Sequence, residues 1–440
     1  MEKYEGSYFK KIDDDLVFLN PVNLSVCILK CENGQTEENF GITISKKQKE
    51  WLIKNSIIFD SDKDDELLVS RYISDKLKYS DVFSFTDAYS FNCNMHCVYC
   101  FEEGINNDPS TTYKDRIKEI DQLVILFGEK VDAIDYVFYG GEPLLYKEYI
   151  DKVSSHLIRK YSRKKIVFSF FSNGTLIDDN FVNLCKKYNF ESIKITLDGP
   201  KEIHDSRRKM KNSSSSYSII INNIKRLLYE TNTNIIINTV IDENNYTEYC
   251  TLADELINEF EDFITSKQPR ITFNIGLLCK PLNTNSYTSK NVESIYNNYK
   301  VYYNELTLLI KKGATCSSPF YSPHCTNSRE KSFIIAPNGN IYKCVAGIMT
   351  DKFLIGTKED LKKDAMKVLK NNSLQIESSH NVMCQKCEFL LMCNGGCKFQ
   401  NKMHNSSLCR KDLLIKEMDC LLELLHIVEF NEDGTIYGKK

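Results

Sequence analysis

The sequence predicts an α/β protein whose central part is a parallel β-sheet. Short apolar runs rich in β-branched and aromatic residues alternate there with longer amphipathic segments. Strands that alternate with helices pack as a parallel sheet, because each helix provides the crossover to the next strand. The expected strands are 82–89, 133–139, 166–171, 192–197, 234–240 and 271–276. The helix-like segments between them include 114–128, 147–161, 178–188 and 217–228.

The first 80 or so residues predict a separate, small α+β unit. Residues 24–29 form an apolar run that predicts a strand. Residues 45–55 predict a helix with Ser45 as its N-cap, and a second helix is expected over 67–77. Such a unit can pack on the next domain or recognise another polypeptide, and the sequence leaves both roles open.

Composition excludes several classes of protein. The 440-residue chain is long enough for more than one domain, and its hydrophobic content of 42% suffices for a large core. A net charge of −3 does not indicate the positively charged surface that binding of nucleic acid requires. The sequence shows neither a signal peptide nor an apolar run as long as a membrane span. The 17 cysteines are grouped at spacings typical of metal ligands, which predicts a reducing cytoplasm rather than disulfides.

Three cysteines, Cys93, Cys97 and Cys100, form a CxxxCxxC pattern just after the first predicted strand of the sheet. Three thiolates on one loop can hold three corners of a cubane iron–sulfur cluster and leave the fourth iron open. The competing interpretation is a structural zinc site, which usually pairs two CxxC or CxxH units. His96 would then have to be the fourth ligand, although it lies between the cysteines, where the loop has little slack. The spacing therefore favours the cluster.

This pattern, with an aromatic residue before its last cysteine, resembles the signature of the radical S-adenosylmethionine (SAM) enzymes. The resemblance implies that the open iron is chelated by the amino and carboxylate groups of SAM. It implies that an electron from the cluster cleaves SAM to a 5′-deoxyadenosyl radical. It also implies that the six strand–helix units form a partial (β/α)6 TIM-like barrel. Chemistry in such barrels lies on loops at the C-terminal ends of the strands, where the triplet falls.

Two glycine-containing segments after predicted strands resemble SAM-binding segments of the same family. Gly140, Gly141 and Glu142 begin a Gly-Gly-Glu-Pro sequence similar to the one that holds the SAM amino group. Asn173 lies in a Ser-Asn-Gly sequence and corresponds to an asparagine near SAM. Taken alone, each segment predicts only a turn. Together with the cysteine triplet, they indicate SAM.

A third segment is similar to one whose aspartate and arginine contact the ribose and the carboxylate of SAM. Asp198 corresponds to the aspartate, and the register favours Arg208 over Arg207 for the arginine. The roles are chemically reasonable, because a carboxylate can accept both ribose hydroxyls and a guanidinium can bind a carboxylate through two hydrogen bonds. His204, in the same segment, is expected to be structural.

From about residue 314 the periodicity fades and cysteines dominate. A zinc ribbon would explain two CxxC-like pairs, but not seven cysteines in this order. The order resembles the SPASM domain, which carries auxiliary [4Fe–4S] clusters in radical SAM enzymes that act on peptides. The resemblance covers residues 316–409.

The resemblance to SPASM domains implies two auxiliary ligand sets. The first cluster would use Cys325, Cys344 and Cys397, with Cys316 as the expected fourth ligand. The second would use Cys384, Cys387, Cys393 and Cys409. With the cluster at the triplet, the chain would hold three [4Fe–4S] clusters. If Cys316 is not a ligand, the first auxiliary cluster has an open iron that could bind a substrate thiolate.

The resemblance implies a domain order and a function. The order is an N-terminal α+β domain (1–80), a radical SAM partial barrel (81–313), a SPASM domain (314–410) and a C-terminal helix and tail (411–440). The function is modification of a ribosomally synthesised peptide by hydrogen abstraction, with a thioether cross-link favoured and a C–C or C–O link as the nearest variant. The expected partners are a precursor peptide, whose leader the N-terminal domain could bind, and an electron donor such as flavodoxin or ferredoxin. A cytoplasmic location is expected, with no nucleic-acid or membrane partner.

Two alternatives remain open. The anaerobic sulfatase-maturating branch oxidises a cysteine or serine to formylglycine. In that branch an aspartate follows the cysteine that matches Cys344, whereas here Val345 does, and 92 residues precede Cys93. The other alternative is a non-catalytic iron–sulfur or zinc scaffold, which would have no use for the Gly-Gly-Glu and Asp198 segments.

Overall fold

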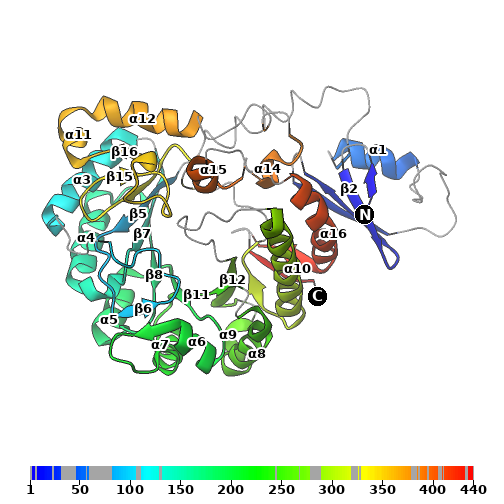
Figure 1. The fold of residues 1–440 in the computed structure, drawn as a ribbon, viewed down its shortest axis with the longest axis horizontal. Helices are drawn as coiled ribbons and strands as arrows, with labels where there is room; N and C mark the ends of the chain where they lie inside the picture. Colours follow the sequence, from blue (N-terminus) through cyan, green and yellow to red (C-terminus); the bar gives the residue numbers. More distant parts are fainter. Residues whose placement is uncertain are drawn as a thin grey trace. The chain divides into compact units, whose positions relative to one another are not determined.

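The structure is a computed structural model, and its contacts divide the chain into two compact units (Figure 1). The barrel unit consists of Tyr79–Asn285 and His324–Ser378, and the terminal unit of Met1–Lys78, Ser286–Pro323 and Ser379–Lys440. The described residues are 2–4, 7–21, 24–30, 46–55, 57–58, 82–105, 111–127, 131–242, 245–266, 268–277, 289–318, 326, 329–377, 384, 387–393, 396–404, 409, 411–431 and 435–439. Both units combine segments that are distant in sequence, and the division into four consecutive domains remains a prediction.

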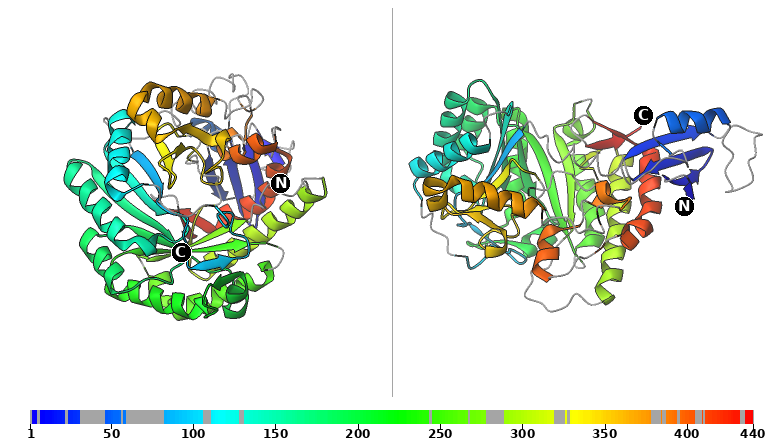
Figure 2. Two further views of the ribbon diagram at one scale, coloured as in Figure 1. Left: turned by 60° about the vertical axis from the view of Figure 1, so that its left-hand side comes forward. Right: turned by 90° about the horizontal axis from the view of Figure 1, so that it is seen from above.

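The barrel unit is built on parallel strands that follow one another in chain order. They are β5 (Val82–Ala88), β7 (Ala133–Tyr139), β8 (Lys165–Ser172), β9 (Ser192–Thr196), β11 (Asn234–Ile241) and β12 (Ile271–Leu277). The sheet curves, and helices cover its outer face (Figures 1 and 2). The predicted α/β fold with a parallel sheet is confirmed, and all six predicted strands are present within one residue of their expected bounds.

The outer helices bury one face of each strand. They include α3 (Tyr113–Phe127), α4 (Lys147–Lys160), α5 (Asp179–Tyr188), α6 (Lys201–Arg207), α7 (Ser216–Glu230), α8 (Tyr249–Glu259) and α9 (Glu261–Ile264). On β7, Ile134, Tyr136 and Phe138 are buried, and the residues between them are partly exposed. Side chains on the two faces of a strand alternate, so the partly exposed set faces the inside of the curved sheet.

Several elements of the barrel unit were not predicted. β14 (Ser332–Ile335) pairs with β5 and extends the sheet through β15 (Ile341–Tyr342) and β16 (Leu354–Gly356). Helices α11 (Lys358–Lys363) and α12 (Ala365–Glu377) follow. β6 (Met95–Cys97) pairs antiparallel with β10 (Arg208–Met210). These strands have only two to four residues, too few to show a period in the sequence.

The N-terminal part of the terminal unit is a four-stranded antiparallel sheet with one described helix. The strands are β1 (Glu2–Tyr4), β2 (Ser7–Ile12), β3 (Asp15–Asn20) and β4 (Ser25–Lys30), and the helix is α1 (Lys46–Lys54). Phe9, Phe18, Cys27 and Leu52 form its core. The predicted strand and first helix are confirmed, whereas β1 to β3 were missed. Ser45 and the helix expected over 67–77 lie outside the described residues.

The rest of the terminal unit is largely helical. It comprises α10 (Ser289–Lys311), β13 (Thr315–Cys316), α14 (Leu390–Cys393), α15 (Lys398–His404), α16 (Lys411–Ile427), β17 (Val428–Phe430) and β18 (Ile436–Gly438). The predicted C-terminal helix, α16, packs against α10 and against β2 and β3. In the described part of the chain, no helix combines the length and apolarity that crossing a membrane requires.

Candidate active site

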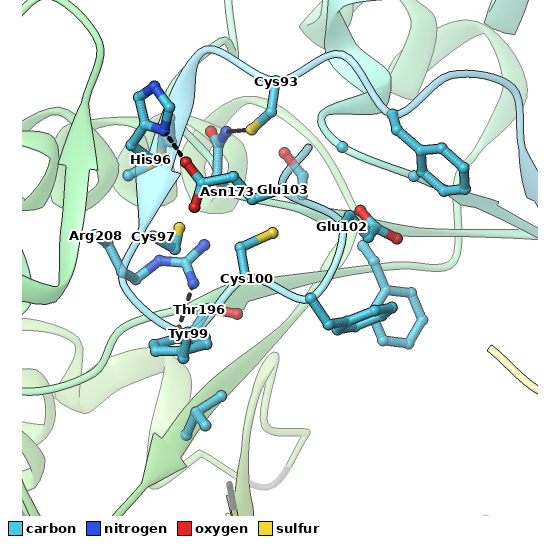
Figure 3. A pocket seen from close by; sticks show the side chains of 18 of the residues that line it. Cys93, His96, Cys97, Tyr99, Cys100, Glu102, Glu103, Asn173, Thr196 and Arg208 are labelled. Carbon is cyan, nitrogen blue, oxygen red and sulfur yellow. Dashed lines mark hydrogen bonds and ion pairs between the residues drawn. The ribbon is translucent and has the colours of Figure 1, made fainter. Parts of the chain in front are cut away.

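A cavity of about 360 Å³ lies at the carboxyl ends of the strands of the barrel unit (Figure 3). Cavities of roughly 300–1,000 Å³ bind small molecules and cofactors. The lining comes from the cysteine loop (residues 91–104), from β10 and from the ends of β7, β8, β9 and β11. Most of the predicted site residues of the barrel line it: Cys93, Cys97, Cys100, Gly140, Gly141, Asn173 and Arg208. Glu142 and Asp198 are not part of the lining.

The cysteine loop is held by backbone bonds to the segment after α6. In the β6–β10 pair, Cys97 is the register partner of Arg208. The Val98 amide also donates to the Arg207 carbonyl at 2.9 Å, and the Cys100 amide donates to the Cys97 carbonyl at 3.0 Å. These backbone hydrogen bonds therefore hold the loop that carries the three thiols.

The donor set fits a cubane better than a single zinc ion. His96 Nδ1 lies 2.5 Å from Glu103 Oε1, so the only histidine of the triplet segment has a partner other than the cysteines (Figure 3). Among the described residues, no three His, Cys, Asp or Glu side chains converge as ligands of one ion. A cubane instead takes each thiolate on a different iron, which suits thiols spread around a cavity.

The surroundings of the thiols favour their protonated form in the absence of a metal. Burial raises the pKa of Cys93 to about 11, and it also raises the pKa of Cys97 and of Cys100. Arg208 opposes this effect at Cys97. Cysteine thiols lose their protons when a metal binds, so bound iron would supply the positive charge that stabilises the three thiolates.

The glycine turn after β7 packs against the start of the cysteine loop. Gly140 has φ +122°, and a Cβ there would overlap the Ser90 carbonyl oxygen. A Cβ on Gly141 would overlap the carbonyl oxygens of Phe91 and Asn92. The Gly141 amide donates to the Ser90 carbonyl at 3.0 Å. The glycines thus permit a close approach between two segments of the chain, in addition to lining the cavity.

Glu142 connects the turns after β7 and β8. Its carboxylate is 1% exposed and accepts hydrogen bonds from the Leu144 amide, the Ser172 hydroxyl and the Asn173 amide at 2.9, 2.9 and 2.7 Å. These three donors occupy both oxygens. The contact of Glu142 with the SAM amino group remains a prediction, and in this geometry Glu142 acts as a link between the two turns.

Asn173 contacts the cysteine loop directly. Its Nδ2 donates to Asn94 Oδ1 at 2.8 Å and lies 3.8 Å from Cys93 Sγ (Figure 3). Its Oδ1 accepts from the amide and the hydroxyl of Thr175 at 2.9 and 2.6 Å. The two donors on Oδ1 fix the orientation of the amide, so the N–H groups point to the loop.

Tyr99 links the two predicted SAM contacts of the third segment. It donates a short hydrogen bond to Asp198, and Arg208 Nη1 donates to its hydroxyl at 2.7 Å. Asp198 is fully buried, and its other oxygen accepts from the Val240 amide at 3.1 Å. The ribose contact of Asp198 therefore remains a prediction that its present partners do not favour. The aromatic position before the last cysteine was the only sequence signal for Tyr99.

The structure separates the two arginines of this segment. Arg208 lines the cavity beside Cys97, whereas Arg207 forms an ion pair with Asp242 at 3.1 Å. The preference for Arg208 as the cavity arginine thus agrees with the geometry. His204 is fully buried and accepts from the Asp198 amide at 3.2 Å, and burial lowers its pKa to about 3.

Sequence reasoning missed Glu102 and Tyr139, which also line the cavity. Burial raises the pKa of Glu102 to about 7, and a hydrogen bond with the Tyr139 side chain opposes the shift. No motif marks either residue, because their proximity depends on how the loop folds over the end of β7.

The auxiliary ligand sets remain predictions. Cys325 lies outside the described residues. Cys344 belongs to the barrel unit, and the other described candidates belong to the terminal unit: Cys316, Cys384, Cys387, Cys393, Cys397 and Cys409. Cys316 is fully buried on β13, which raises the pKa of its thiol well above the usual range. The Cys387 amide donates to the Cys384 carbonyl at 3.1 Å, so these two cysteines share one turn.

Comparison with known proteins agrees with this geometry. Residues 89–256 match the Radical SAM superfamily. A cysteine-type anaerobic sulfatase-maturating enzyme of Clostridium novyi is 27% identical over 344 residues, which are 72% of this chain and 87% of that protein. The structure of anSMEcpe with bound AdoMet has a TM-score of 0.61 at 22% identity, over 78% of this chain and 98% of that one. Streptococcus suis SuiB bound to S-adenosylmethionine has a TM-score of 0.55 at 16% identity, over 92% of this chain and 97% of that one.

Residues 89–256 carry a radical SAM domain, so the resemblance predicted from the cysteine triplet is confirmed. The chain carries a radical SAM domain followed by a cysteine-rich C-terminal region, and it is similar to sulfatase-maturating enzymes and to SuiB. A radical SAM domain implies bound SAM and a [4Fe–4S] cluster, for which the cavity provides three cysteines.

Proposed function

We propose that this protein is a radical SAM/SPASM maturase that modifies a ribosomally synthesised precursor peptide. The observation that carries the proposal is one cavity in which Cys93, Cys97 and Cys100 meet Asn173 and Arg208. When bound, a [4Fe–4S] cluster and SAM supply a 5′-deoxyadenosyl radical that abstracts a hydrogen atom from the peptide.

The chain's own residues bind, orient and shield these groups. The three cysteines provide thiolate ligands, and Arg208 provides a guanidinium suited to a carboxylate. Phe91, Phe101 and Phe171 give the cavity apolar walls that limit the access of water to the reacting atoms. The C-terminal cysteines are proposed to hold two auxiliary [4Fe–4S] clusters, and a flavodoxin or ferredoxin is the proposed electron donor.

Two structural relatives support a peptide substrate. SuiB was solved bound to the precursor peptide SuiA, and anSMEcpe was solved with AdoMet and the Kp18Cys peptide. The fold of SuiB also covers a larger share of this chain than that of anSMEcpe, 92% against 78%. That larger share favours the peptide-maturase branch over the shorter sulfatase-maturating enzymes.

The N-terminal sheet offers a site for the leader of the precursor. Among the described residues, β4 pairs with β3 and with no other strand. The second edge of such a strand can receive an extended peptide as an additional strand. Hydrogen–deuterium exchange with and without leader peptide tests this: new protection is expected in β4. Protection confined to the barrel unit would assign the leader elsewhere.

The preferred product is a thioether between a cysteine sulfur and a carbon of another residue. The test incubates reconstituted enzyme with SAM, reductant and the precursor peptide, and then measures 5′-deoxyadenosine and the peptide mass. Any cross-link lowers the mass by two hydrogen atoms, but only a thioether also removes one thiol from alkylation by iodoacetamide. A cross-linked peptide with all thiols alkylated would indicate a C–C or C–O link. Absence of 5′-deoxyadenosine would contradict the enzyme function itself.

Formylglycine formation is the second candidate, because several relatives are sulfatase-maturating enzymes at 27–28% identity over 70–72% of this chain. Val345, in place of the aspartate of that branch, and the additional N-terminal sheet count against it. A sulfatase-motif peptide incubated with enzyme and SAM distinguishes the two, since formylglycine reacts with an aldehyde probe. A labelled product would overturn the preference for a cross-link.

A further inference from the structure

The inner wall of the cavity carries a lysine that none of these roles uses. Lys194 lies on β9 and lines the cavity. It is the register partner of Phe171 on β8, and its Nζ lies 5.1 Å from the centre of that ring. Tyr139, at the end of β7, packs edge-on against the same ring with the centroids 5.7 Å apart. Lys194 thus ends an aromatic row that crosses three adjacent strands.

The ammonium group of Lys194 has no polar partner in the part of the chain that the structure describes: only the Phe171 ring faces it. Burial lowers the pKa of Lys194, and no neighbouring charge offsets that effect. Lys194 is partly exposed to the cavity, so an anionic ligand there can replace water as the partner of its ammonium group through charge-assisted hydrogen bonds.

No carboxylate of the cavity lining is left to pair with Lys194, and the thiolates of the triplet would be bound to iron. Two carboxylates line the cavity, and both have other partners: Glu103 pairs with His96, and Glu102 is hydrogen-bonded to Tyr139. SAM would bring one carboxylate, for which Arg208 is the predicted partner, together with an ammonium and a sulfonium cation. A carboxylate for Lys194 therefore has to come from another molecule.

We propose that Lys194 binds a carboxylate of the peptide substrate and thereby selects peptides with an acidic group beside the modified residue. The apolar face of Phe171 packs under the bound group, and the ammonium donates to its oxygens. The carboxylate belongs to an Asp or Glu side chain or to the peptide C-terminus. This inference rests on the proposed function, because it requires that the cavity receives a peptide.

Competitive acetylation tests the proposal on the reconstituted full-length protein. Acetic anhydride is added under anaerobic conditions, and acetylation is quantified lysine by lysine by mass spectrometry. The probes are N-acetyl-glutamate N-methylamide for a side-chain carboxylate, N-acetylglycylglycine for a C-terminal one, and N-acetyl-glutamine N-methylamide as the uncharged analogue. Lys165, exposed at the start of β8, is the control in the same sample.

Protection of Lys194 by one carboxylate probe, with no protection by the glutamine analogue and no change at Lys165, is the expected result. The probe that protects identifies the source of the carboxylate. Equal protection by the charged and uncharged probes, or by none, overturns the proposal, as does failure of Lys194 to react while Lys165 does.

A variant separates substrate binding from SAM binding. Lys194→Met should lose binding of the carboxylate probe that protects Lys194 in the wild type, and the SAM affinity of the variant is measured separately by equilibrium binding. A tenfold or greater loss of SAM affinity would assign Lys194 to SAM and overturn the proposal. If neither protein forms 5′-deoxyadenosine, the proposed function fails instead, whatever the acetylation pattern.

Discussion

At the scale of single residues, the side-chain amide of Asn173 is oriented by its neighbours to donate toward the cysteine loop. Thr175 holds its oxygen through two hydrogen bonds, and the N–H groups consequently face Asn94 and the sulfur of Cys93. Hydrogen bonds to the sulfurs of an iron–sulfur cluster help to set its reduction potential. An N–H donor stabilises the more negative, reduced form, so Asn173 should raise the potential of the cluster.

Replacement of this donor gives the first prediction. Asn173→Asp keeps the shape but removes the N–H groups and adds negative charge, so the potential of the cluster should become more negative. An EPR-monitored redox titration measures the shift. Asn223→Asp is the matched control, because Asn223 Nδ2 bonds the Gly174 carbonyl of the same turn at 2.8 Å without contacting sulfur. Equal potentials in the Asn173 variant and the wild type would contradict the role of this hydrogen bond.

His204 predicts a pH dependence of stability. Its pKa is lowered from 6.5 to about 3 in the folded protein, so the unfolded chain binds the proton first as pH falls. The stability that neutral His204 contributes is complete above about pH 6.5 and is lost progressively down to about pH 3. At pH 5 the loss is about 2 kcal/mol. Urea unfolding of the wild type and of His204→Asn between pH 7 and pH 5 should show a weaker dependence in the variant, and equal slopes would contradict this assignment.

Single residues were predictable from the sequence where a motif fixes them. The triplet and Arg208 were found because family spacing marks them, and all line the cavity. Lys194 and Tyr139 were not found, because a residue on an inner strand face becomes notable only when neighbouring strands are in register. The hydrogen bonds of Glu142 were not predicted for a related reason, since its three donors come from two separate turns.

At the scale of elements, the site depends on the contact between the glycine turn and the cysteine loop. Gly141→Ala would place a methyl group against the Phe91 and Asn92 carbonyls, where only backbone could move to relieve it. Such overpacking costs about 1–3 kcal/mol or more. The loop should shift, so the variant should lose SAM affinity and iron from the triplet site.

The control for that variant is Gly276→Ala on β12. The nearest atom to an added Cβ there is the Thr239 carbonyl oxygen at 3.8 Å, an ordinary contact. SAM affinity by equilibrium binding and iron content should stay at wild-type levels in this control. Similar losses in both variants would mean that Gly141 is needed for the stability of the sheet and not for the contact between the turn and the loop.

The six long strands of the barrel unit and the helices α3, α4, α5 and α7 have periods that can be read. Their bounds were predicted to within one or two residues. β6 and β10 have three residues each, and their pairing joins segments more than 100 residues apart. β1 to β3 were missed although β3 has an apolar run, because the acidic and basic residues around the hairpin turns obscure the alternation.

At the scale of the whole molecule, the ligands for the proposed clusters are unevenly distributed. The triplet lies within one loop of the barrel unit, so its cluster can assemble from that unit alone. The proposed auxiliary sets use other cysteines, which lie between Cys316 and Cys409 in the sequence. Iron at the triplet should therefore be separable from iron at the C-terminal cysteines.

Metal content of the anaerobically reconstituted protein measures this directly. Three cubanes require about twelve irons and twelve sulfides per chain. Replacing Cys93, Cys97 and Cys100 together by Ala should leave about eight irons and abolish SAM cleavage, because only the triplet site is removed. A wild-type value of about eight would place an empty site among the C-terminal cysteines, with Cys316 as the first candidate to examine. Loss of all iron from the triple variant would contradict independent clusters, and zinc at the C-terminal cysteines would exclude them from electron transfer.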